Sequence, residues 1–171
     1  DVCSSDLEAT LPPLQSDLAK EITKDPYNFD FLCLTKGYQE KELENALTDN
    51  ITKFLLELGS GFAFVGKQYK LIVGGDEFRI DLLFYHIRLR CYVVIELKVV
   101  DFKPEFAGKL NFYVAACNKL LRQPEDNPTI GLLLCKSKDQ TKVEWAFDSI
   151  QNPIGVATYE GIKIKDKLPS V

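Results

Sequence analysis

The hydrophobic positions change their spacing several times along the chain, and each spacing predicts a different element of structure. From 38 to 58 they recur every three or four residues, which predicts one long amphipathic helix that ends at the glycines of 59–61. Three runs rich in β-branched and aromatic residues follow, and they predict strands at 62–73, 78–86 and 91–100. Short turn segments at 74–77 and 87–90 join these runs, so the strands are predicted to form an antiparallel meander.

The second half of the chain alternates between helical and strand patterns. A helix is predicted from 104 to about 121, where the proline-containing segment 123–128 ends it. The elements predicted after it are a buried strand at 129–135, a helix at 140–147 and a short strand at 155–158. Residues 8–36 predict short helices before the first long one. The order αβββαβαβ is typical of an α/β protein with a mixed central sheet flanked by helices.

Length and composition are those of one globular domain. The chain has 171 residues, of which 46% are hydrophobic, and this is enough for one core. We expect residues 38–171 to form the domain, residues 8–37 to be a helical N-terminal extension, and residues 1–7 to be an adapter-like leader foreign to the fold. The chain begins with Asp and contains no Met, which is typical of a fragment of a longer protein.

The charge distribution bears on whether the protein binds nucleic acid, and the cysteine content bears on its compartment. The net charge of −4 argues against a general polyanion binder, but residues 67–122 hold ten Lys and Arg against six Asp and Glu. That local excess is compatible with a phosphate-facing surface and equally with an ordinary mixed-charge surface. The five cysteines are scattered without a CxxC pair, so we expect reduced thiols and a cytoplasmic location. No apolar run is long enough to predict a membrane span, and no membrane partner is expected.

Charged residues interrupt two of the predicted strands at positions where burial is costly. Glu96 and Lys98 lie in a run that is hydrophobic on both faces, and Asp81 lies in the preceding strand. Because side chains alternate along a strand, Glu96 and Lys98 share one face. If residues 87–90 connect the two strands, Asp81 lies directly opposite Glu96, with Cβ atoms about 5 Å apart. Two carboxylates at that distance repel each other unless a cation compensates them.

This arrangement predicts a divalent metal site. Asp81, Glu96, the main-chain oxygen of Leu97 and water are ligands that suit Mg²⁺, with Mn²⁺ as a substitute. Lys98 would lie beside the ion and position the attacking water or contact a phosphate oxygen, so the predicted chemistry is metal-assisted phosphodiester hydrolysis. The alternative is an ion pair of Lys98 with either carboxylate on a solvated face. The apolar context of both strands favours the metal site.

The order of elements and the place of these residues resemble the PD-(D/E)XK nuclease superfamily, whose αβββαβ core carries Asp on its second strand and Glu-x-Lys on its third. Five further segments resemble one family within it. They are similar to the C-terminal nuclease domain of the YhcG family and comprise residues 58–69, 80–86, 94–98, 108–113 and 128–135. The similarity covers roughly residues 15–160 and implies a restriction-endonuclease-like fold.

The resemblance implies additional site residues. The first helix of the superfamily commonly contributes a glutamate, and Glu44 matches it better than Glu42. The helix after the third strand often carries Gln-x-x-x-Tyr facing the site, and the corresponding positions are Lys109 and Tyr113, as groups that contact substrate. A lysine in place of glutamine still brings positive charge toward a phosphate backbone. Gln68, on the neighbouring strand, either faces the same cleft and contacts substrate or makes a cross-strand hydrogen bond.

These observations predict that the protein is a Mg²⁺-dependent nuclease that hydrolyses DNA phosphodiester bonds. The predicted catalytic residues are Asp81, Glu96, Lys98 and Glu44. The resemblance implies that the domain is the catalytic part of a larger DNA-acting protein with a separate N-terminal domain, and a homodimer is compatible with it. The alternative is a catalytically silent module that binds nucleic acid or supports assembly while keeping the nuclease fold. A purely structural domain is the third hypothesis.

Overall fold

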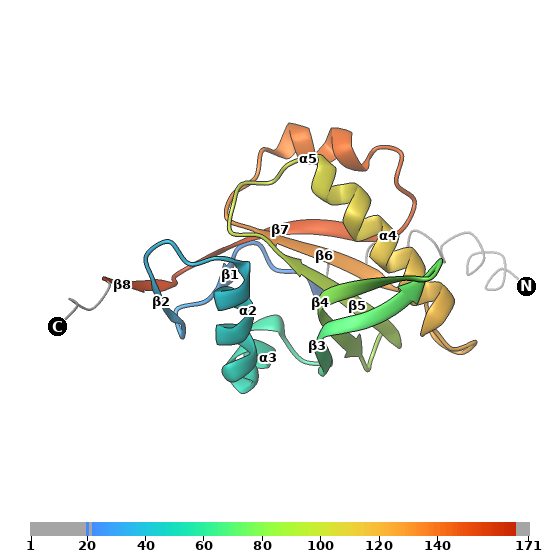
Figure 1. Cartoon of the computed structure of the whole chain (residues 1–171), viewed down its shortest axis with the longest axis horizontal. Coiled ribbons are helices and arrows are strands. Elements are labelled where there is room, and N and C mark those ends of the chain that lie inside the picture. Colours follow the sequence, from blue (N-terminus) through green and yellow to red (C-terminus); the bar gives the residue numbers. More distant parts are fainter. Residues whose placement is uncertain (1–19, 21, 167–171) are drawn as a thin grey trace, which may run out of the picture.

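The computed structural model describes Lys20 and residues 22–166, which form a mixed sheet with helices on both faces (Figure 1). The helices are α2 (Glu40–Asp49), α3 (Ile51–Leu58), α4 (Glu105–Leu120) and α5 (Gln140–Phe147). The strands are β1 (Tyr27–Asn28), β2 (Cys33–Thr35), β3 (Phe62–Val73), β4 (Asp76–His86), β5 (Cys91–Leu97), β6 (Ile130–Cys135), β7 (Ile154–Glu160) and β8 (Lys163–Lys165). The predicted leader, and every residue before Lys20, lies outside the described part of the chain.

The central sheet has the strand order β1-β7-β6-β5-β4-β3. Strands β3, β4 and β5 form the predicted antiparallel meander, whereas β5, β6, β7 and β1 run parallel to one another. Strands β2 and β8 pair separately as a two-stranded parallel sheet. The protein therefore has the predicted α/β fold with a mixed sheet and the restriction-endonuclease-like order αβββαβ.

Helices cover both faces of β5 and explain why its sequence is apolar throughout. On one face Ile95 belongs to the core that includes Leu47 of α2 and Phe54 of α3. On the other face Val94 packs in a second core with Val114 of α4. Figure 1 shows α2 and α3 on one side of the sheet and α4 and α5 on the other. A strand enclosed in this way has no solvated face, so a charged residue within it is costly.

Asn50 divides the helix that was predicted to run continuously from 38 to 58. Its backbone leaves helical geometry, with φ −113° and ψ 41°, and its Nδ2 donates to the Ala46 carbonyl at 2.9 Å. A side-chain amide that bonds the preceding turn in this way competes with continuation of the helix. As a result α2, whose Glu44 lies near Asp81 of β4, is a separate helix from α3, which packs against the sheet.

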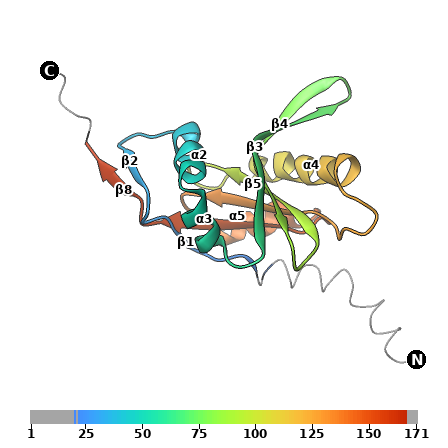
Figure 2. The same ribbon diagram turned by 90° about the horizontal axis from the view of Figure 1, so that it is seen from below.

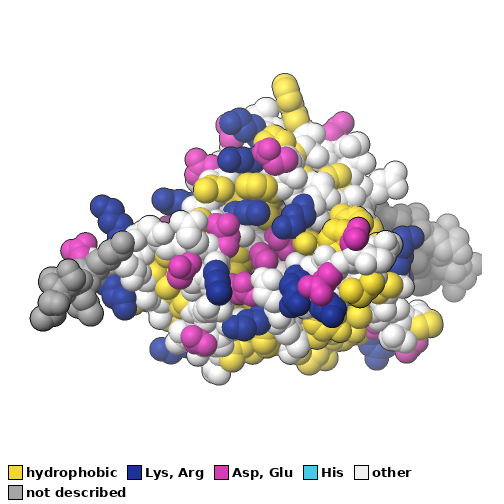
Figure 3. All heavy atoms as spheres, viewed as in Figure 1, with side chains coloured by type: hydrophobic (Ala, Val, Ile, Leu, Met, Phe, Trp, Pro, Cys, Tyr) yellow, Lys and Arg dark blue, Asp and Glu magenta, His cyan; other side chains and the backbone are white. Residues whose placement is uncertain are grey.

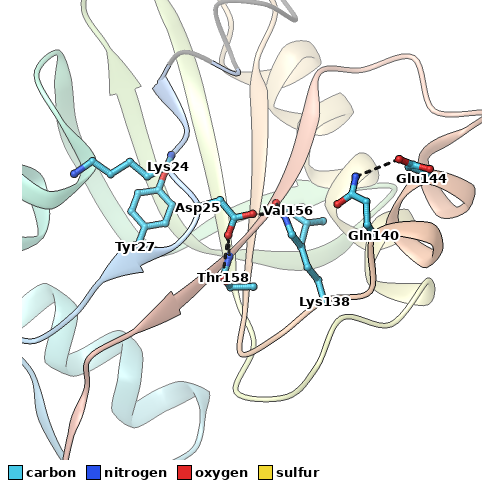
Figure 4. Close-up of polar contacts among 8 residues, drawn as sticks. All are labelled: Lys24, Asp25, Tyr27, Lys138, Gln140, Glu144, Val156 and Thr158. Carbon is cyan, nitrogen blue, oxygen red and sulfur yellow. Dashed lines mark hydrogen bonds and ion pairs between the residues drawn. The ribbon is translucent and has the colours of Figure 1, made fainter.

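Short strands, rather than the predicted short helices, occupy residues 25–36. Strand β1 joins the central sheet by pairing Tyr27 with Tyr159 of β7. Figure 4 shows the adjoining contacts of Asp25, which accepts hydrogen bonds from the Thr158 amide at 3.0 Å and the Thr158 hydroxyl at 2.8 Å and pairs with Lys138. Thr158 lies 133 residues after Asp25, so no local pattern indicates this pairing.

The β3–β4 hairpin extends beyond the sheet and leans over α4 (Figure 2). Its turn is shorter than predicted, because β4 begins at Asp76 and only Gly74 and Gly75 connect the strands, with φ of 59° and 85°. Both values suit the left-handed backbone of a tight hairpin turn. Phe78, near the tip, lies with its ring centroid 4.9 Å from that of Phe112 on α4. This contact ties the hairpin to the helix beside the candidate site.

Four of the five cysteines lie in the described part of the chain. Among residues 20 and 22–166, Cys91, Cys117 and Cys135 are buried and Cys33 is exposed, and these four thiols form no disulfide. Burial raises the pKa of the Cys117 thiol to about 11, which keeps it protonated at neutral pH. Within residues 20 and 22–166, no helix is long and apolar enough to cross a bilayer.

Candidate active site

The register of β4 against β5 sets Asp81 across from Glu96, as the four-residue connection predicted. Paired positions run from His86–Cys91 to Leu82–Ile95, and the next pair in this register is Asp81 with Glu96. The regular ladder ends just before these two residues. The strands therefore stop exchanging backbone hydrogen bonds at the point where the carboxylates begin.

Side-chain carboxylates replace the ladder at this point. The Asp81 amide donates to Oε1 of Glu96 at 3.3 Å, and the Leu97 amide donates to Oδ2 of Asp81 at 3.0 Å. In an extended strand the N–H and C=O of one residue point toward the same neighbour, so the Leu97 carbonyl faces the Asp81 side as well. Two carboxylates and one main-chain oxygen thus converge where β4 and β5 separate.

Glu96 is a buried acid with an unusual protonation equilibrium. Its side chain is 2% exposed. Burial, and next the nearby charge of Asp81, raise the pKa of Glu96 from 4.5 to about 8, although Lys109 and Lys98 oppose the shift. In the absence of a cation, Glu96 is therefore largely protonated at neutral pH.

Lys98 lies one residue beyond β5, not within a longer strand as predicted. Its amide donates to the Leu134 carbonyl and its carbonyl accepts from the Tyr159 hydroxyl, both at 2.8 Å, so its backbone is held on two sides. Its ammonium lies 4.5 Å from the ring centroid of Phe106 on α4. The Lys98 side chain thus lies on the α4 side of the sheet; the alternation had predicted only that Lys98 and Glu96 share a face.

Helix α2 brings Glu44 to the site and keeps Glu42 away from it. Glu44 is 6% exposed, and both of its carboxylate oxygens accept from Nε2 of Gln68, at 3.1 and 2.9 Å. Glu42 instead accepts from the Gln39 amide at 3.0 Å in the capping box at the start of the helix. Desolvation first, and then the charge of Asp81, raise the pKa of Glu44. The structure therefore places Glu44, the preferred of the two glutamates, beside Asp81.

Gln68 both makes the predicted cross-strand hydrogen bond and faces the cleft, so its two predicted alternatives hold together. Its Nε2 donates to Oδ1 of Asp81 at 3.2 Å as well as to Glu44. The flanking ladder pairs, Lys67–Leu82 and Tyr69–Ile80, show that Gln68 lies opposite Asp81. The side chain therefore belongs to the acidic centre itself, and its amide hydrogens are directed to two carboxylates.

Lys109 and Tyr113 occupy successive turns of α4 beside the same centre. The Lys109 ammonium lies 5.6 Å from the ring centroid of Tyr113, and Lys109 is the first of the two lysines that lower the pKa of Glu96. Tyr113 is only 4% exposed and packs with Phe78 of the hairpin. Lys109 thus presents charge to the site, while Tyr113 supports it from the core between helix and hairpin.

A cleft of about 560 Å³ opens beside Asp81, Glu44 and Gln68, and its remaining walls come from residues that the sequence did not single out. They are Glu40, Lys41, Asn45 and Lys67. Nζ of Lys67 donates to Oδ1 of Asn45 at 3.1 Å, which links β3 to α2 across the cleft. Helical spacing could have predicted the wall residues on α2, because residues 40, 41, 44 and 45 lie on one side of a helix. The cleft therefore has an acidic floor and two lysines at its rim.

The oxygen atoms gathered here suit a hydrated Mg²⁺ or Mn²⁺ ion. Carboxylates and a carbonyl are hard ligands, and Mg²⁺ needs few of them from the protein because it keeps several waters. Among residues 20 and 22–166, no three His, Cys, Asp or Glu side chains converge as a ready-made metal site. The pair Asp81 and Glu96, completed by a main-chain oxygen and water, matches the smaller protein contribution that Mg²⁺ requires.

The sequence matches the family model described as the YhcG PDDEXK nuclease domain over residues 20–171. A curated protein of Escherichia coli (strain K12), named "Putative nuclease YhcG", is 36% identical over 157 residues, which make up 92% of this chain and 42% of that protein. The chain thus spans less than half the length of this relative.

Two solved structures are similar at lower levels. The first is described as "crystal structure of a repair endonuclease from Pyrococcus abyssi", with 18% identity, a TM-score of 0.46, and coverage of 75% of this chain and 50% of that one. The second, "Structure of EndoMS-dsDNA2 complex", has 15% identity, a TM-score of 0.45, and coverage of 78% and 46%.

Proposed function

This chain belongs to the family of YhcG PDDEXK nuclease domains, and we propose that it hydrolyses phosphodiester bonds of DNA with Mg²⁺ as its cofactor. It is a nuclease domain by membership of that family, whose type generally uses divalent metal ions. The observation that carries the proposal for this chain is the pair of opposed carboxylates, Asp81 and Glu96, at the end of the β4–β5 ladder. The chain would be the catalytic part of a larger DNA-acting protein, since it spans 42% of its relative.

Asp81, Glu96 and the Leu97 carbonyl would hold the ion, with Glu44 approaching from α2. When bound, the ion would supply Lewis acidity and lower the pKa of a coordinated water. Its charge would also offset the burial and repulsion that raise the pKa of Glu96 to about 8. Without a cation, two carboxylates held together in a buried position destabilise the folded protein. A bound cation would remove this destabilisation.

Lys98 would act on the phosphate. Its backbone is held by Leu134 and Tyr159, and the Phe106 ring limits the positions of its ammonium. An ammonium fixed beside the ligands would stabilise negative charge that develops on the phosphate oxygens and would orient the attacking water. Lys109 would add a second positive charge from α4.

The face that carries the cleft has the charge pattern that a DNA backbone requires. Figure 3 shows acidic side chains in the middle of this face, between α2 and the β3–β4 hairpin, with Lys and Arg side chains around them. The rim lysines of the cleft are Lys41 and Lys67. We propose that they receive the phosphates next to the scissile one, because both line the cleft that contains Asp81 and Glu44.

Replacing both rim lysines, as Lys41→Ala with Lys67→Ala, is expected to weaken binding of a fluorescein-labelled duplex about tenfold at low salt. Each lost phosphate contact also reduces the slope of log Kd against log salt by about one. Fluorescence anisotropy in EDTA measures binding without cleavage. The matched control is Lys142→Ala on α5, which removes an exposed charge away from the cleft. An unchanged salt slope in the double variant would contradict this path for the DNA.

Cleavage of supercoiled plasmid tests the proposed function directly. The wild-type domain is expected to cleave in Mg²⁺ or Mn²⁺ and to stop in EDTA, and Asp81→Ala is expected to be inactive in either ion. Asp76→Ala, at the exposed end of the same strand, removes the same charge and is expected to remain active. Equal cleavage by wild type and Asp81→Ala would refute the assigned site. Salt-sensitive DNA binding without cleavage by any form would favour the silent binding module.

A further inference from the structure

The amide nitrogen of Gln68 lies between two carboxylates that belong to different elements. It is within 3.1 and 2.9 Å of the two oxygens of Glu44 on α2, and within 3.2 Å of Oδ1 of Asp81 on β4. A side-chain amide has two N–H donors, so one can serve each carboxylate. The Gln68 amide is therefore the group that joins α2 to β4 at the acidic centre.

The backbone of Gln68 adopts a conformation that side-chain-bearing residues rarely use. Its φ is 49°, in the left-handed region, where a residue other than Gly is uncommon and signals a local constraint. The ladder between β3 and β4 shifts register between Phe64 and Gly66, a short distance before it. Nη1 of Arg79 also approaches the Gln68 carbonyl at 3.5 Å. The bulge and this contact help to hold a strained residue opposite Asp81.

The Gln68 amide is a neutral donor, so it can hydrogen-bond to the two carboxylates but cannot neutralise their charge. It satisfies oxygens of Glu44 and Asp81 but cancels no charge, so the repulsion between the carboxylates persists. Oxygens of both carboxylates lie within 3.2 Å of the same nitrogen, so their negative charges face each other across it. A cation at the same place would satisfy the same oxygens and also remove the repulsion.

We propose that the Gln68 amide holds the place of the cation between Glu44 and Asp81 in the metal-free protein and withdraws when a divalent ion binds. This inference rests on the proposed metal site and assigns Gln68 a positioning role within it. A cation shared by these carboxylates and the Gln68 nitrogen compete for one position, because Nε2 is already in hydrogen-bond contact with both. Displacing it breaks hydrogen bonds to charged groups, which are among the stronger ones in proteins. The wild-type affinity for the ion is thus reduced by a built-in competitor.

Mn²⁺ binding to the metal-free domain, measured by calorimetry without DNA, tests this competition. Gln68→Asn keeps an amide and tolerates a left-handed backbone but is one methylene shorter, so it loses the span between the two acids. Gln68→Gly removes the side chain and also relieves the backbone constraint. Both are expected to bind Mn²⁺ about five- to tenfold more tightly than wild type. The matched control is Gln140→Asn, which shortens an amide that donates to Glu144 on α5, outside the site (Figure 4).

The side-chain NH₂ signals of Gln68 in ¹⁵N-labelled protein give a second measurement. During a Mg²⁺ titration their chemical shifts are expected to change in proportion to the fraction of protein that has bound the ion, toward the values of an amide without hydrogen-bond partners. The chemical shifts of the Gln140 side-chain NH₂ group are expected to stay constant. Equal or weaker Mn²⁺ binding by folded Gln68→Asn and Gln68→Gly would overturn the competition while leaving the metal site intact. Absence of Mn²⁺ binding in wild type and in both variants would overturn the metal site and the competition together.

Discussion

Glu96→Gln is expected to make the metal-free domain more stable at pH 8, by roughly 3 kcal/mol, while reducing DNA cleavage at least about a thousandfold. The stability gain arises because glutamine carries no charge at a position that is 2% exposed and faces Asp81. The loss of activity arises because an amide is a poor substitute for a carboxylate ligand of Mg²⁺. Urea unfolding in EDTA measures the first effect, and plasmid cleavage in Mg²⁺ the second.

The pH dependence of the wild type follows from the same shift. The pKa of Glu96 is about 8 in the folded protein, against the usual glutamate value of 4.5 that applies to the unfolded chain. Between pH 4.5 and pH 8 the folded protein therefore keeps a proton on Glu96 that the unfolded chain has released. Stability of the metal-free domain is therefore expected to fall as pH rises from about 4.5 to about 8, and to level off above. Saturating Mg²⁺ is expected to flatten this fall, because the ion favours the charged carboxylate.

Glu125→Gln provides the control for this prediction, since it makes the same substitution in the exposed segment before β6. It is expected to leave both the pH profile and the cleavage rate as they are in the wild type. A Glu96→Gln variant with the wild-type pH profile would show that Glu96 is not the group that titrates. A variant that was destabilised at pH 8 would show that the buried carboxylate is ionised and stabilised by the protein itself.

Lys98→Ala is expected to slow DNA cleavage by about two to three orders of magnitude in single-turnover kinetics while Mn²⁺ affinity stays within about threefold of wild type. Lys98 contributes charge beside the carboxylates without being a ligand, so the loss should fall on the chemical step. Lys98→Arg is expected to recover only part of the rate, because a planar guanidinium cannot take the position of a compact ammonium against Phe106.

Lys103→Ala is the matched control, because it removes an exposed lysine five residues further along the chain. It is expected to cleave DNA at the wild-type rate. If Lys98→Ala kept more than about a tenth of the wild-type rate, the role assigned to Lys98 would pass to Lys109, which faces Glu96 from α4. A double variant, Lys98→Ala with Lys109→Ala, would then be the inactive form.

Local patterns in the sequence determined the part of the site that lies on consecutive strands. The length of the 87–90 connection set the β4–β5 register, and the register set Asp81 opposite Glu96. Alternation along β5 predicted that Glu96 and Lys98 share one face, and the bounds predicted for α4 and α5 are close to those observed. These features depend on hydrogen-bond partners and side-chain directions within short stretches of chain, which is why spacing alone predicts them.

Tertiary structure decided which residues from separate elements meet. The rotation of α2 against the sheet decides between Glu42 and Glu44, because it leaves Glu42 at the start of the helix, where it accepts from the Gln39 amide, and brings Glu44 into contact with Gln68. The pairing of β1 with β7 joins residues more than a hundred positions apart, and no turn signal specifies it. The raised pKa of Glu96 likewise depends on burial by surrounding elements. The sequence determined the strand carboxylates and their register, and only the packed fold decided that Gln68 would lie between Glu44 and Asp81.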